Sequence, residues 1–576
     1  MRRNFQSVAP LKLPFDVELT MPGSKSHANR AIIAACLSSG KTTIRNATAC
    51  DDVNLLVKNL QNMGFDIGYA ERKTGTLIVN GGIPKLQGKR SKKLYCGNAG
   101  TTLRFLTALA CITPGSFVIT GDEAMQKRPI HDLVEALQAL GAYINDTNGC
   151  PPVTVGRGKI HGGRIMLESQ KSSQYLSALL LIAPATRGLS IELSSSLPSQ
   201  SYVHLTQRVM RDFGVMVHKR KGTFSVPKHS AYRIPTTYDI EGDHSAAGAF
   251  FVLAELTESN VRFSNLHRSS EQGDAVLPKV IIRMRKRGDI VIDCANIPDQ
   301  VMNLAVLAAF RSGQTILTGI ANLRYKECDR ISVLTHELHK AGIEIRERND
   351  DLIVQGGTHA RAAVLDPHND HRMAFCFAVL GSIHRGIRIK DPACVSKSYP
   401  QFFGDLAKLH HSSKPIALIG MRGVGKSTLG KQLASSLGLE HIDSDTVFER
   451  KHGNIQTYVQ KKGWMKFREE EEWIIAECLQ PRSVLSLGGG AVESAKTRRL
   501  LRSRSIAIHL QGSASSILAR LKKDQRPSLT SLSLEQEVPL IMKRRAPLFQ
   551  NAAHISLKEP HGIQSAIQSL QALCSL

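Results

Sequence analysis

The sequence has no long hydrophobic run. Its longest apolar stretches, at 176–185 and 304–310, are too short to cross a lipid bilayer. The N-terminal segment is charged and lacks the apolar core of a signal peptide, so we expect a cytoplasmic protein with no membrane partner. The 11 cysteines are scattered, with no C-x-x-C pair and no cluster with histidine at zinc-binding spacing. Neither a disulfide framework nor a structural zinc site is therefore expected.

Aromatic residues are scarce too, at 5% of the 576 residues. Proteins that bind single-stranded nucleic acid stack aromatic side chains on the bases, and this sequence offers few of them. Lys and Arg number 75 against 49 Asp and Glu, a formal net charge of +26. Such an excess indicates an anionic partner without saying which kind. Because no block of the chain is a polybasic tail, we expect small anionic substrates and no nucleic acid.

A pattern of helix, glycine and short strand repeats five times. Apolar residues at helical spacing lead to a glycine and then to a short alternating run, and the glycines are Gly64, Gly141, Gly214, Gly288 and Gly342. Glycine at this place lets a helix end in a left-handed cap and the chain turn back as a strand. The first four copies are about 75 residues apart, which suits a compact unit of two helices and several strands. We predict an α/β fold of repeated units, with a sixth helix at 402–409.

The pattern stops at residues 410–415, HHSSKP, a polar stretch ending in proline that we predict to be a linker. A short apolar run, IALIG, then opens a different order of strands and helices. We therefore predict two α/β modules, one at 1–409 and the other at 416–576.

The second module begins with GMRGVGKST at 420–428, which fits the pattern G-x-x-x-x-G-K-[ST] between a predicted strand and a predicted helix. In such a loop, backbone N–H groups surround the phosphates of a nucleotide, and the positive end of the helix adds to the attraction. The lysine reaches the terminal phosphates, and the hydroxyl of the next residue holds Mg²⁺. The predicted nucleotide-binding residues are Gly423, Gly425, Lys426, Ser427 and Thr428.

Further motifs follow in this module. HIDSD carries Asp443 and Asp445 where the second strand should end, so one carboxylate could serve the metal and the other a substrate hydroxyl. FREEEEW places Arg468 at the start of a helix, and LSLGGGA places three glycines where a substrate ring could approach the backbone. Arg526 in QRPSL and Arg545 in KRRAPLF supply further contacts for anions.

Together with the phosphate loop, and in this order, these motifs resemble those of shikimate kinase over the whole module. The resemblance implies a kinase domain with a parallel sheet, which uses ATP and Mg²⁺ to phosphorylate the 3-hydroxyl of shikimate. It implies that shikimate is bound by Asp445, Arg468, Gly489 and Arg545. It further implies that Ser427 and Asp443 serve the metal and that Arg526 lies on a lid over ATP. The chain departs from the family at Trp464, where an acidic residue usually follows the glycine.

In the first module, basic and small polar residues gather in short motifs between the repeated units. The motifs are GSKSHANR, GNAGTTLR, RPI, SSQ, PSQSY, IPDQVM, NLRYKECDR, NDHRMA and SKSYP. As a set they offer a site for more than one anion, together with carboxylates for proton transfer.

This set resembles 5-enolpyruvylshikimate-3-phosphate (EPSP) synthase, an enolpyruvyl transferase, from about residue 12 to 407. The resemblance implies an α/β fold of two lobes with three repeated units each, lobe A at 1–22 and 240–409 and lobe B at 23–239. Ligands would bind in a cleft between the lobes, which would close and expel water. The implied reaction transfers the carboxyvinyl group of phosphoenolpyruvate to the 5-hydroxyl of shikimate 3-phosphate, releases phosphate and needs no cofactor.

The resemblance also implies the residues of this reaction. Shikimate 3-phosphate would be bound by Lys25, Ser26, Arg30, Ser172, Ser173, Gln174, Ser199, Tyr202, Asp299, Asn322 and Lys326. Phosphoenolpyruvate would be bound by Lys25, Gly100, Arg128, Gln174, Arg330, Arg372 and Lys397. The catalytic residues would be Asp299, Glu327 and Lys25, with the two carboxylates as the proton-transfer pair. Which carboxylate performs which step stays open, with Asp299 favoured as the base for the hydroxyl.

Three alternative functions are compatible with parts of the sequence. The related transferase that acts on a UDP-sugar has a reactive cysteine in its phosphoenolpyruvate loop, whereas GDEAMQKRP in this chain has none. Another small-molecule kinase is disfavoured by the DSD, FR and GGG motifs. A basic binding protein without catalysis would bind polyanions with a steep salt dependence and turn over ATP regardless of shikimate.

The two resemblances support each other, because the kinase product is the acceptor of the transferase. We therefore expect one bifunctional enzyme of aromatic amino-acid biosynthesis. Its expected partners are shikimate, ATP, shikimate 3-phosphate and phosphoenolpyruvate, and the sequence leaves its oligomeric state open.

Overall fold

The chain forms two compact units in a computed structural model that describes residues 4–85, 91–156, 160–233, 235–523, 529–559 and 562–572. The larger unit comprises Met1–Pro10, Leu19–Leu253 and Phe263–Phe402. The smaller comprises Leu11–Glu18, Ala254–Arg262 and Phe403–Leu576. Within the described ranges, no helix combines the length and the apolar character needed to cross a membrane.

Four sheets of the larger unit share one strand order. The first sheet is β14 (Thr237–Asp239), β3 (Gly40–Arg45), β5 (Thr76–Gly81) and β4 (Asp66–Glu71); the second is β6 (Lys92–Tyr95), β7 (Phe117–Thr120), β9 (Cys150–Val155) and β8 (Ile144–Thr147); the third is β10 (Gly163–Leu167), β11 (Leu189–Leu193), β13 (Thr223–Val226) and β12 (His218–Arg220); the fourth is β16 (Ile290–Asp293), β17 (Gln314–Thr318), β19 (Asp351–Gln355) and β18 (Ile345–Arg348). In each, the first two strands are parallel and the last two form an antiparallel hairpin. Parallel neighbours need a long crossover and hairpins only a turn, so a strand–helix–strand–helix–hairpin unit recurs in the second, third and fourth sheets. In the first sheet, the outer parallel strand β14 follows the hairpin in the chain.

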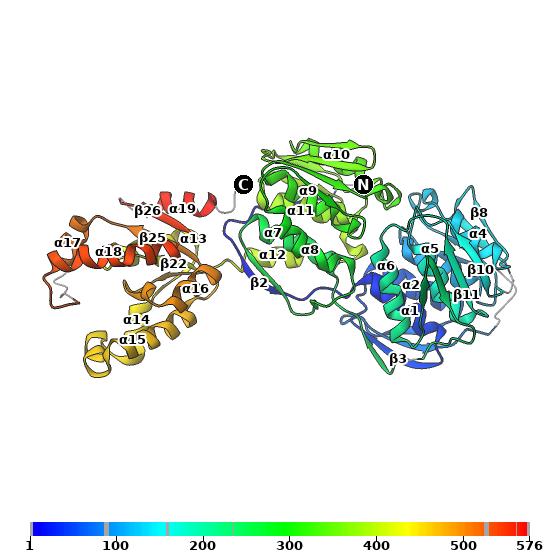
Figure 1. The fold of residues 1–576 in the computed structure, drawn as a ribbon, viewed down its shortest axis with the longest axis horizontal. Coiled ribbons are helices and arrows are strands. Elements are labelled where there is room, and N and C mark those ends of the chain that lie inside the picture. Colours follow the sequence, from blue (N-terminus) through cyan, green and yellow to red (C-terminus); the bar gives the residue numbers. More distant parts are fainter. Residues whose placement is uncertain are drawn as a thin grey trace. The chain divides into compact units, whose positions relative to one another are not determined.

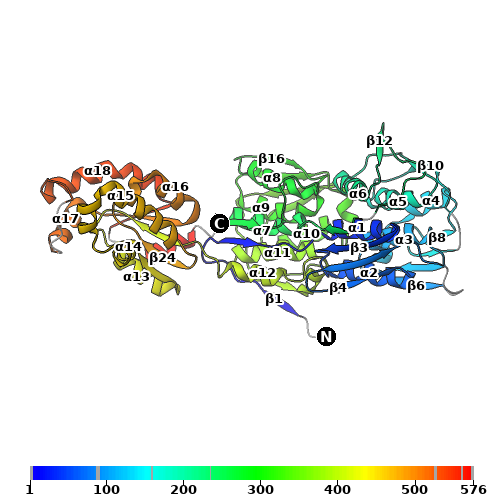
Figure 2. The ribbon, with the colours of Figure 1, turned by 90° about the horizontal axis from the view of Figure 1, so that it is seen from below.

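Two smaller sheets accompany these four. Their strands are β1 (Phe5–Ser7), β21 (Ile387–Lys390) and β20 (Ala363–Leu365) in one, and β2 (Asp16–Leu19) with β15 (Asn260–Phe263) in the other. The three sheets built from residues 40–239 form one group, drawn blue to teal in Figure 2, and the sheet of β16 to β19 lies in another, drawn green.

Two kinds of helix alternate between these strands. One kind is apolar on nearly every face, comprising α1 (Lys25–Leu37), α3 (Gly100–Ala110), α5 (Gln174–Ile182), α7 (His244–Leu256), α9 (Val301–Phe310) and α11 (His371–Ile383). The other kind has one apolar face, comprising α2 (Asp51–Met63), α4 (His131–Ala139), α6 (Gln200–Asp212), α8 (Leu277–Met284), α10 (Arg330–Lys340) and α12 (Phe402–Leu409). Helices that are apolar all round must be buried. Here α1, α3 and α5 pack on one another (Figure 2), and α9 packs on α11 (Figure 1).

The predicted glycine caps are confirmed. All five glycines have positive φ, from 80° at Gly214 to 102° at Gly64, and each follows a helix and precedes a strand. The predicted sixth helix is α12, with the predicted bounds. One copy differs, because the strand after Gly288 is β16, which pairs in parallel with β17 and opens a new sheet. The sequence shows that a strand follows the glycine, but the pairing of that strand is decided by its neighbours in space.

The chain passes twice between the two groups of sheets, and the two passages lie side by side. Gly23 and Gly242 form an antiparallel bridge, Ser24 N donates to Glu241 O at 2.9 Å, and Asp243 N donates to Pro22 O at 2.9 Å. A Cβ on Gly23 would lie 1.6 Å from the carbonyl oxygen of Asn46, so only glycine fits there. These passages lie near residues 22 and 240, and the lobe boundaries of the sequence analysis stay a prediction.

The smaller unit has one parallel sheet, which confirms the prediction. Its order is β23 (Glu440–Asp443), β24 (Ser483–Ser486), β22 (Ile416–Ile419), β25 (Ile506–Gln511) and β26 (Ile555–Lys558). Its helices are α13 (Lys426–Leu437), α14 (Ser444–His452), α15 (Ile455–Cys478), α16 (Ala495–Arg504), α17 (Ala514–Lys523), α18 (Leu534–Ala552) and α19 (Ile563–Ala572). β22 is buried along its whole length, as a central strand of a parallel sheet must be.

The predicted linker at 410–415 is hydrogen-bonded within the smaller unit. Ser413 bridges to Phe15, and Arg482 N donates to Ser413 O at 3.2 Å. Lys414 N donates to Pro14 O at 2.7 Å, and both Ser413 and Lys414 are buried. A polar stretch ending in proline resembles a linker in sequence because its hydrogen-bond partners are distant in the chain.

Replacing Gly288 by alanine tests the left-handed caps. A Cβ at Gly288 would meet open space, so only its φ of +83° opposes a side chain. We expect Gly288→Ala to lower the free energy of unfolding of the larger unit by about 1 kcal/mol in urea titrations. Gly288→Asn is the matched control, since asparagine tolerates this conformation and should lose less. An alanine variant as stable as the wild type would contradict this account.

Candidate functional site

A charged cavity lies in the larger unit, with an unfilled volume, open mouth included, of about 640 Å³. The N-terminal ends of α1, α3 and α5 meet at it, and helix N-termini attract anions. The predicted residues that line it are Lys25, Ser26, Arg30, Gly100, Arg128, Ser172, Ser173, Gln174, Ser199, Tyr202, Asp299, Asn322, Lys326, Glu327 and Arg330. Motifs scattered over 300 residues of sequence thus converge on one place.

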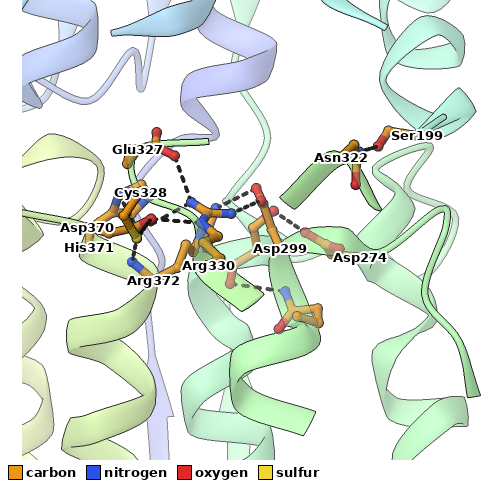
Figure 3. A network of polar contacts seen from close by, with 12 residues as sticks. Ser199, Asp274, Asp299, Asn322, Glu327, Cys328, Arg330, Asp370, His371 and Arg372 are labelled. Atoms are coloured by element: carbon orange, nitrogen blue, oxygen red, sulfur yellow. Dashed lines mark hydrogen bonds and ion pairs between the residues drawn. The ribbon is translucent and has the colours of Figure 1, made fainter. Parts of the chain in front are cut away.

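Arg330 is the centre of an ion-pair network beside this cavity (Figure 3). Its side chain is 2% exposed, and it contacts Asp299 at 2.8 Å, Glu327 at 3.0 Å and Asp370 at 2.7 Å. The two remaining predicted cations join the same carboxylates: Arg372 lies 3.3 Å from Asp299, and Lys397 lies 2.6 Å from Glu327. The predicted proton-transfer pair is therefore held on one guanidinium.

The two carboxylates are kept ionised by their surroundings. Burial disfavours the charged form of Asp299, but Arg372, Arg330 and Lys326 outweigh it and hold the pKa of Asp299 well below its usual range. Burial likewise opposes ionisation of Glu327, and Lys397 and Arg330 hold its pKa well below the usual range. Both groups are proton acceptors at neutral pH.

Two other groups at the cavity have pKa values shifted by burial. Burial lowers the pKa of Lys326 to about 8, although the nearby charge of Asp299 opposes the shift. Burial, together with the charges of Lys25 and Arg372, lowers the pKa of His371 well below its usual value, so this imidazole is neutral.

The predicted acceptor-binding residues form a second cluster of contacts. Tyr202 donates to Asp299 at 2.9 Å, and Asn322 donates to the hydroxyl of Ser199 at 2.9 Å. Ser199 has a φ of 54°, an uncommon value for a residue with a side chain, and this directs the chain into α6. Gln174 donates to the hydroxyl of Thr101 at 3.1 Å. Hydroxyl and amide groups thus line the cavity, and the hydroxyl of Tyr202 contacts the carboxylate that we expect to accept a proton.

Glycine leaves room where two guanidiniums approach the start of α3. A Cβ on Gly100 would lie 2.7 Å from both Arg104 Nη1 and Arg128 Nη2. The predicted role of Gly100 therefore has a steric reason: it leaves room for positive charge next to backbone N–H groups.

Four residues of the site were missed by the sequence analysis. Asp52 and Thr101 line the cavity, and Asp52 pairs with Lys25 at 2.8 Å. Asp370 and His371 stand in NDHRMA, of which the sequence predicts only Arg372 as a site residue. Their place inside a motif of the predicted site is the signal that points to them, whereas Asp52 resembles an ordinary acidic residue in the first turn of a helix.

The smaller unit carries the predicted phosphate loop between β22 and α13. Gly423 and Gly425 have φ values of 77° and 100°, which side chains rarely adopt. Lys426 Nζ donates to the carbonyls of Gly420 and Met421 at 3.0 and 2.9 Å, and so lies along the loop. Thr428 follows on α13. This is the backbone cradle that the motif predicts for phosphates.

Ser427 and Asp443 are placed to serve a metal ion. Ser427 Oγ donates to Asp443 Oδ2 at 2.7 Å, which brings two hard oxygen donors together, one in the first turn of α13 and one at the end of β23. No group of three His, Cys, Asp or Glu residues that could hold a metal exists in the parts of the chain that the structure covers. Mg²⁺ is commonly held by one or two protein oxygens together with phosphates and water, so these residues fit it.

A second cavity, which lies in the smaller unit, contains the predicted shikimate-binding arginines. Its unfilled volume, open mouth included, is about 760 Å³. Arg545 Nη1 donates to the carbonyl of Gly489 at 3.0 Å. Arg468 and Arg545 both contact Glu493, which the sequence analysis missed. Arg526 lies outside the described residues.

The three-glycine turn lets charged side chains come close. A Cβ on Gly490 would lie 2.0 Å from Arg468 Nη2, and one on Gly488 would lie 2.7 Å from Asp445 Oδ1. The turn thus brings Arg468 and Asp445 to one place, opposite in charge, where a small acid with hydroxyl groups could be held. Opposite charges so arranged suit the predicted substrate.

Comparisons with known proteins agree with both parts of the chain. The family model described as EPSP synthase (3-phosphoshikimate 1-carboxyvinyltransferase) matches residues 12–406, and the shikimate kinase model matches residues 422–573. The 3-phosphoshikimate 1-carboxyvinyltransferase of Shewanella denitrificans is 35% identical over 413 residues, covering 68% of this chain and 96% of that protein. The solved structure of EPSP synthase from Acinetobacter baumannii superposes with a TM-score of 0.59 at 25% identity, covering 71% of this chain and 98% of that one.

A longer relative contains both parts. The pentafunctional AROM polypeptide of Yarrowia lipolytica is 32% identical over 604 aligned residues, which cover 94% of this chain and 38% of the relative. The chain thus spans about two fifths of the length of that relative. The predicted two-lobed transferase fold, followed by a kinase domain, is confirmed. The chain belongs to the EPSP synthase family and carries a shikimate kinase domain after the EPSP synthase domain.

Proposed function

We propose that the chain performs two consecutive reactions. The kinase domain phosphorylates the 3-hydroxyl of shikimate with ATP, and the transferase domain adds the carboxyvinyl group of phosphoenolpyruvate to the 5-hydroxyl of the product. The observation that carries the proposal is the pairing of Asp299 and Glu327 on the buried Arg330 beside a cation-lined cavity. We place the enzyme in the cytoplasm, because scattered cysteines suit a reducing compartment.

In the transferase domain, the cations and helix ends bind two anions. Lys25, Arg128 and Lys397 hold the phosphoenolpyruvate, and Arg30 and Lys326 hold the acceptor. When these basic groups surround both substrates, they exclude water from the site. They also stabilise the charge that develops as the new C–O bond forms. Arg330 and Arg372 take part through their contacts with the carboxylates as well as through the substrate.

The two carboxylates carry out proton transfer. Asp299 accepts the proton of the 5-hydroxyl as that oxygen bonds to the central carbon of phosphoenolpyruvate, and Glu327 with Lys25 supplies the proton that the methylene carbon gains. Phosphate then leaves the central carbon and the new methyl group gives a proton back to the carboxylate pair, which restores the carbon–carbon double bond of the carboxyvinyl product. The pKa values of both carboxyls are held low by nearby cations. Bound phosphate and carboxylate neutralise those cations, which raises both pKa values toward the range in which a carboxyl exchanges protons effectively.

In the kinase domain, binding and alignment supply most of the catalysis. The backbone of the phosphate loop and Lys426 hold the phosphates of ATP, and Ser427 and Asp443 hold Mg²⁺, which when bound neutralises phosphate charge. Asp445 orients the 3-hydroxyl of shikimate toward the terminal phosphate. Arg468, Gly489 and Arg545 fix the ring and its carboxylate.

Two variants separate the activities. We expect Lys426→Ala to reduce ADP formation from shikimate and ATP by about 10²–10³-fold, because it removes a cation from the transferring phosphate. The same variant still releases phosphate when shikimate 3-phosphate and phosphoenolpyruvate are supplied. Phosphate release from shikimate, ATP, Mg²⁺ and phosphoenolpyruvate at the wild-type rate in this variant would contradict the kinase assignment.

The reciprocal variant is Asp299→Asn, which keeps the size of the side chain and removes its basicity. We expect it to lower phosphate release from shikimate 3-phosphate and phosphoenolpyruvate by about 10²–10⁴-fold. ADP formation from shikimate and ATP serves as its internal control and should persist. Undiminished phosphate release would show that Asp299 is not the base.

The pKa of Lys326 gives a prediction for pH dependence. A lysine with a pKa of about 8 loses its charge as the pH rises through 8, so kcat/KM for shikimate 3-phosphate should fall above that pH. Lys326→Arg keeps the charge, since arginine stays protonated, and should move this fall to higher pH. Measuring kcat/KM from pH 6 to 10 for both proteins, with comparable KM at pH 7, checks it. The prediction fails if the fall stays near pH 8 in the arginine variant.

A further inference from the structure

Glu493 lies among three arginines of the cavity in the smaller unit. It ends the short 3-10 helix η7 (Ala491–Glu493), directly after the three-glycine turn. Its Oε1 accepts from Arg545 Nε at 3.0 Å and from Arg544 Nη2, and its Oε2 lies 3.4 Å from Arg468 Nη2. A single carboxylate thus bridges guanidiniums from α15 and α18.

The hydrogen bonds of Arg545 show which edge of its guanidinium this carboxylate occupies. A guanidinium binds a carboxylate best through two parallel N–H groups on one edge. Nη1 of Arg545 donates to the carbonyl of Gly489, and Nε donates to Glu493. The Nε edge, on which an incoming carboxylate would make a bidentate pair, is therefore engaged by a carboxylate of the protein itself.

Arg468 is engaged in the same way. Its Nη1 donates to Glu471 and its Nη2 to Glu493, while its guanidinium carbon lies 5.6 Å from the ring centre of Trp464. Both arginines that we expect to bind the carboxylate of shikimate thus contact Glu493 in the structure.

Glu493 is an anion under ordinary conditions. Burial opposes its charge, but Arg545 above all, with Arg544 and Arg468, lowers the pKa of this carboxyl below its usual value. The side chain is 28% exposed, so it can leave the arginines for water. It stays charged, and free to exchange places with another anion, throughout the neutral pH range.

We propose that Glu493 is a specificity-determining residue, a tethered carboxylate that occupies the substrate-carboxylate position and must be displaced from Arg468 and Arg545 by the bound acid. The inference rests on the proposed shikimate-binding role of this cavity. Displacement costs free energy that every carboxylic acid must offset. An acid whose ring hydroxyls also contact the site, near Asp445, offsets it, whereas a simple carboxylic acid does not. Glu493 therefore selects for hydroxylated acids.

Glu493→Gln tests this competition. The neutral amide should lower KM for shikimate by about fivefold, with kcat at saturating shikimate changed less than about twofold, as measured by ADP formation. Inhibition by cyclohexanecarboxylate, which lacks the hydroxyls, should strengthen by at least the same factor. Glu469→Gln is the matched control, because it makes the same charge change at an exposed residue paired with Lys466.

A binding measurement supports the kinetics. Trp464 and Trp473 are the only tryptophans of the chain, and Trp464 lies in the wall of the cavity. In a Trp473→Phe background, the fluorescence of Trp464 should change on addition of shikimate, and Glu493→Gln should lower the dissociation constant by the same fivefold or so. An unchanged or raised dissociation constant overturns the proposal, as does a raised KM or a lowered kcat.

Arg544 provides a second test. It is 65% exposed and contacts Glu493, so it offers that carboxylate a partner away from the other two arginines. Arg544→Gln should raise KM for shikimate when Glu493 is present and leave it unchanged in the Glu493→Gln background. An equal rise in both backgrounds would mean that Arg544 contacts the substrate directly and would overturn its action through Glu493.

If the wild type forms no ADP in response to shikimate, the proposed function itself fails. If the wild type responds and the variants do not differ, only this inference fails.

Discussion

The ion pairs of Arg330 are the interaction on which the transferase site depends. Burying a charge costs several kcal/mol unless it is paired, and here Arg330 is paired with Asp299, Glu327 and Asp370. Asp370 also caps α11, through a hydrogen bond to the backbone of Arg372, so the network joins α10, α11 and the turn that carries Asp299. A charge arrangement that positions the reacting groups thus also joins the elements around them. Its geometry is set by the network as a whole rather than by any single pair.

The negative charge of this network explains the surrounding positive charge. The three carboxylates leave two negative charges that one guanidinium does not balance, and the three cations Arg372, Lys397 and Lys326 more than offset them. These same groups are the ones expected to meet anionic substrates. Arrival of phosphate and carboxylate therefore changes the charge balance around the carboxylates, and substrate binding and proton affinity become linked. Part of the formal excess of basic residues in the chain therefore offsets the carboxylates of this site, which accounts for these cations without a polyanionic partner.

The kinase site also pairs arginines with a carboxylate of the protein, but that carboxylate is less buried. Its arginines also face a protein carboxylate, but Glu493 is partly exposed and can be replaced by a ligand, whereas Asp370 is buried and cannot. Glycine is decisive in both sites. Gly100 and Gly490 leave room for guanidiniums that any Cβ would push away, so the approach of charge to backbone is permitted by the absence of a side chain.

The sequence by itself determined the α/β class, the repeated unit with its glycine caps, the phosphate loop and the motifs of the two sites, because these depend on short spacings and on backbone conformations that particular residues require. Most of the predicted residues of the transferase domain line one cavity, because their motifs stand at or near helix N-termini that the repeated units bring together. Only the tertiary structure decided which groups pair. Asp52 with Lys25, Asp370 with Arg330, Glu493 with the arginines and Ser413 with Phe15 join residues whose separation in sequence carries no signal. Such pairs depend on long-range packing, which places charges and hydrogen-bonding groups side by side only when the whole chain has folded.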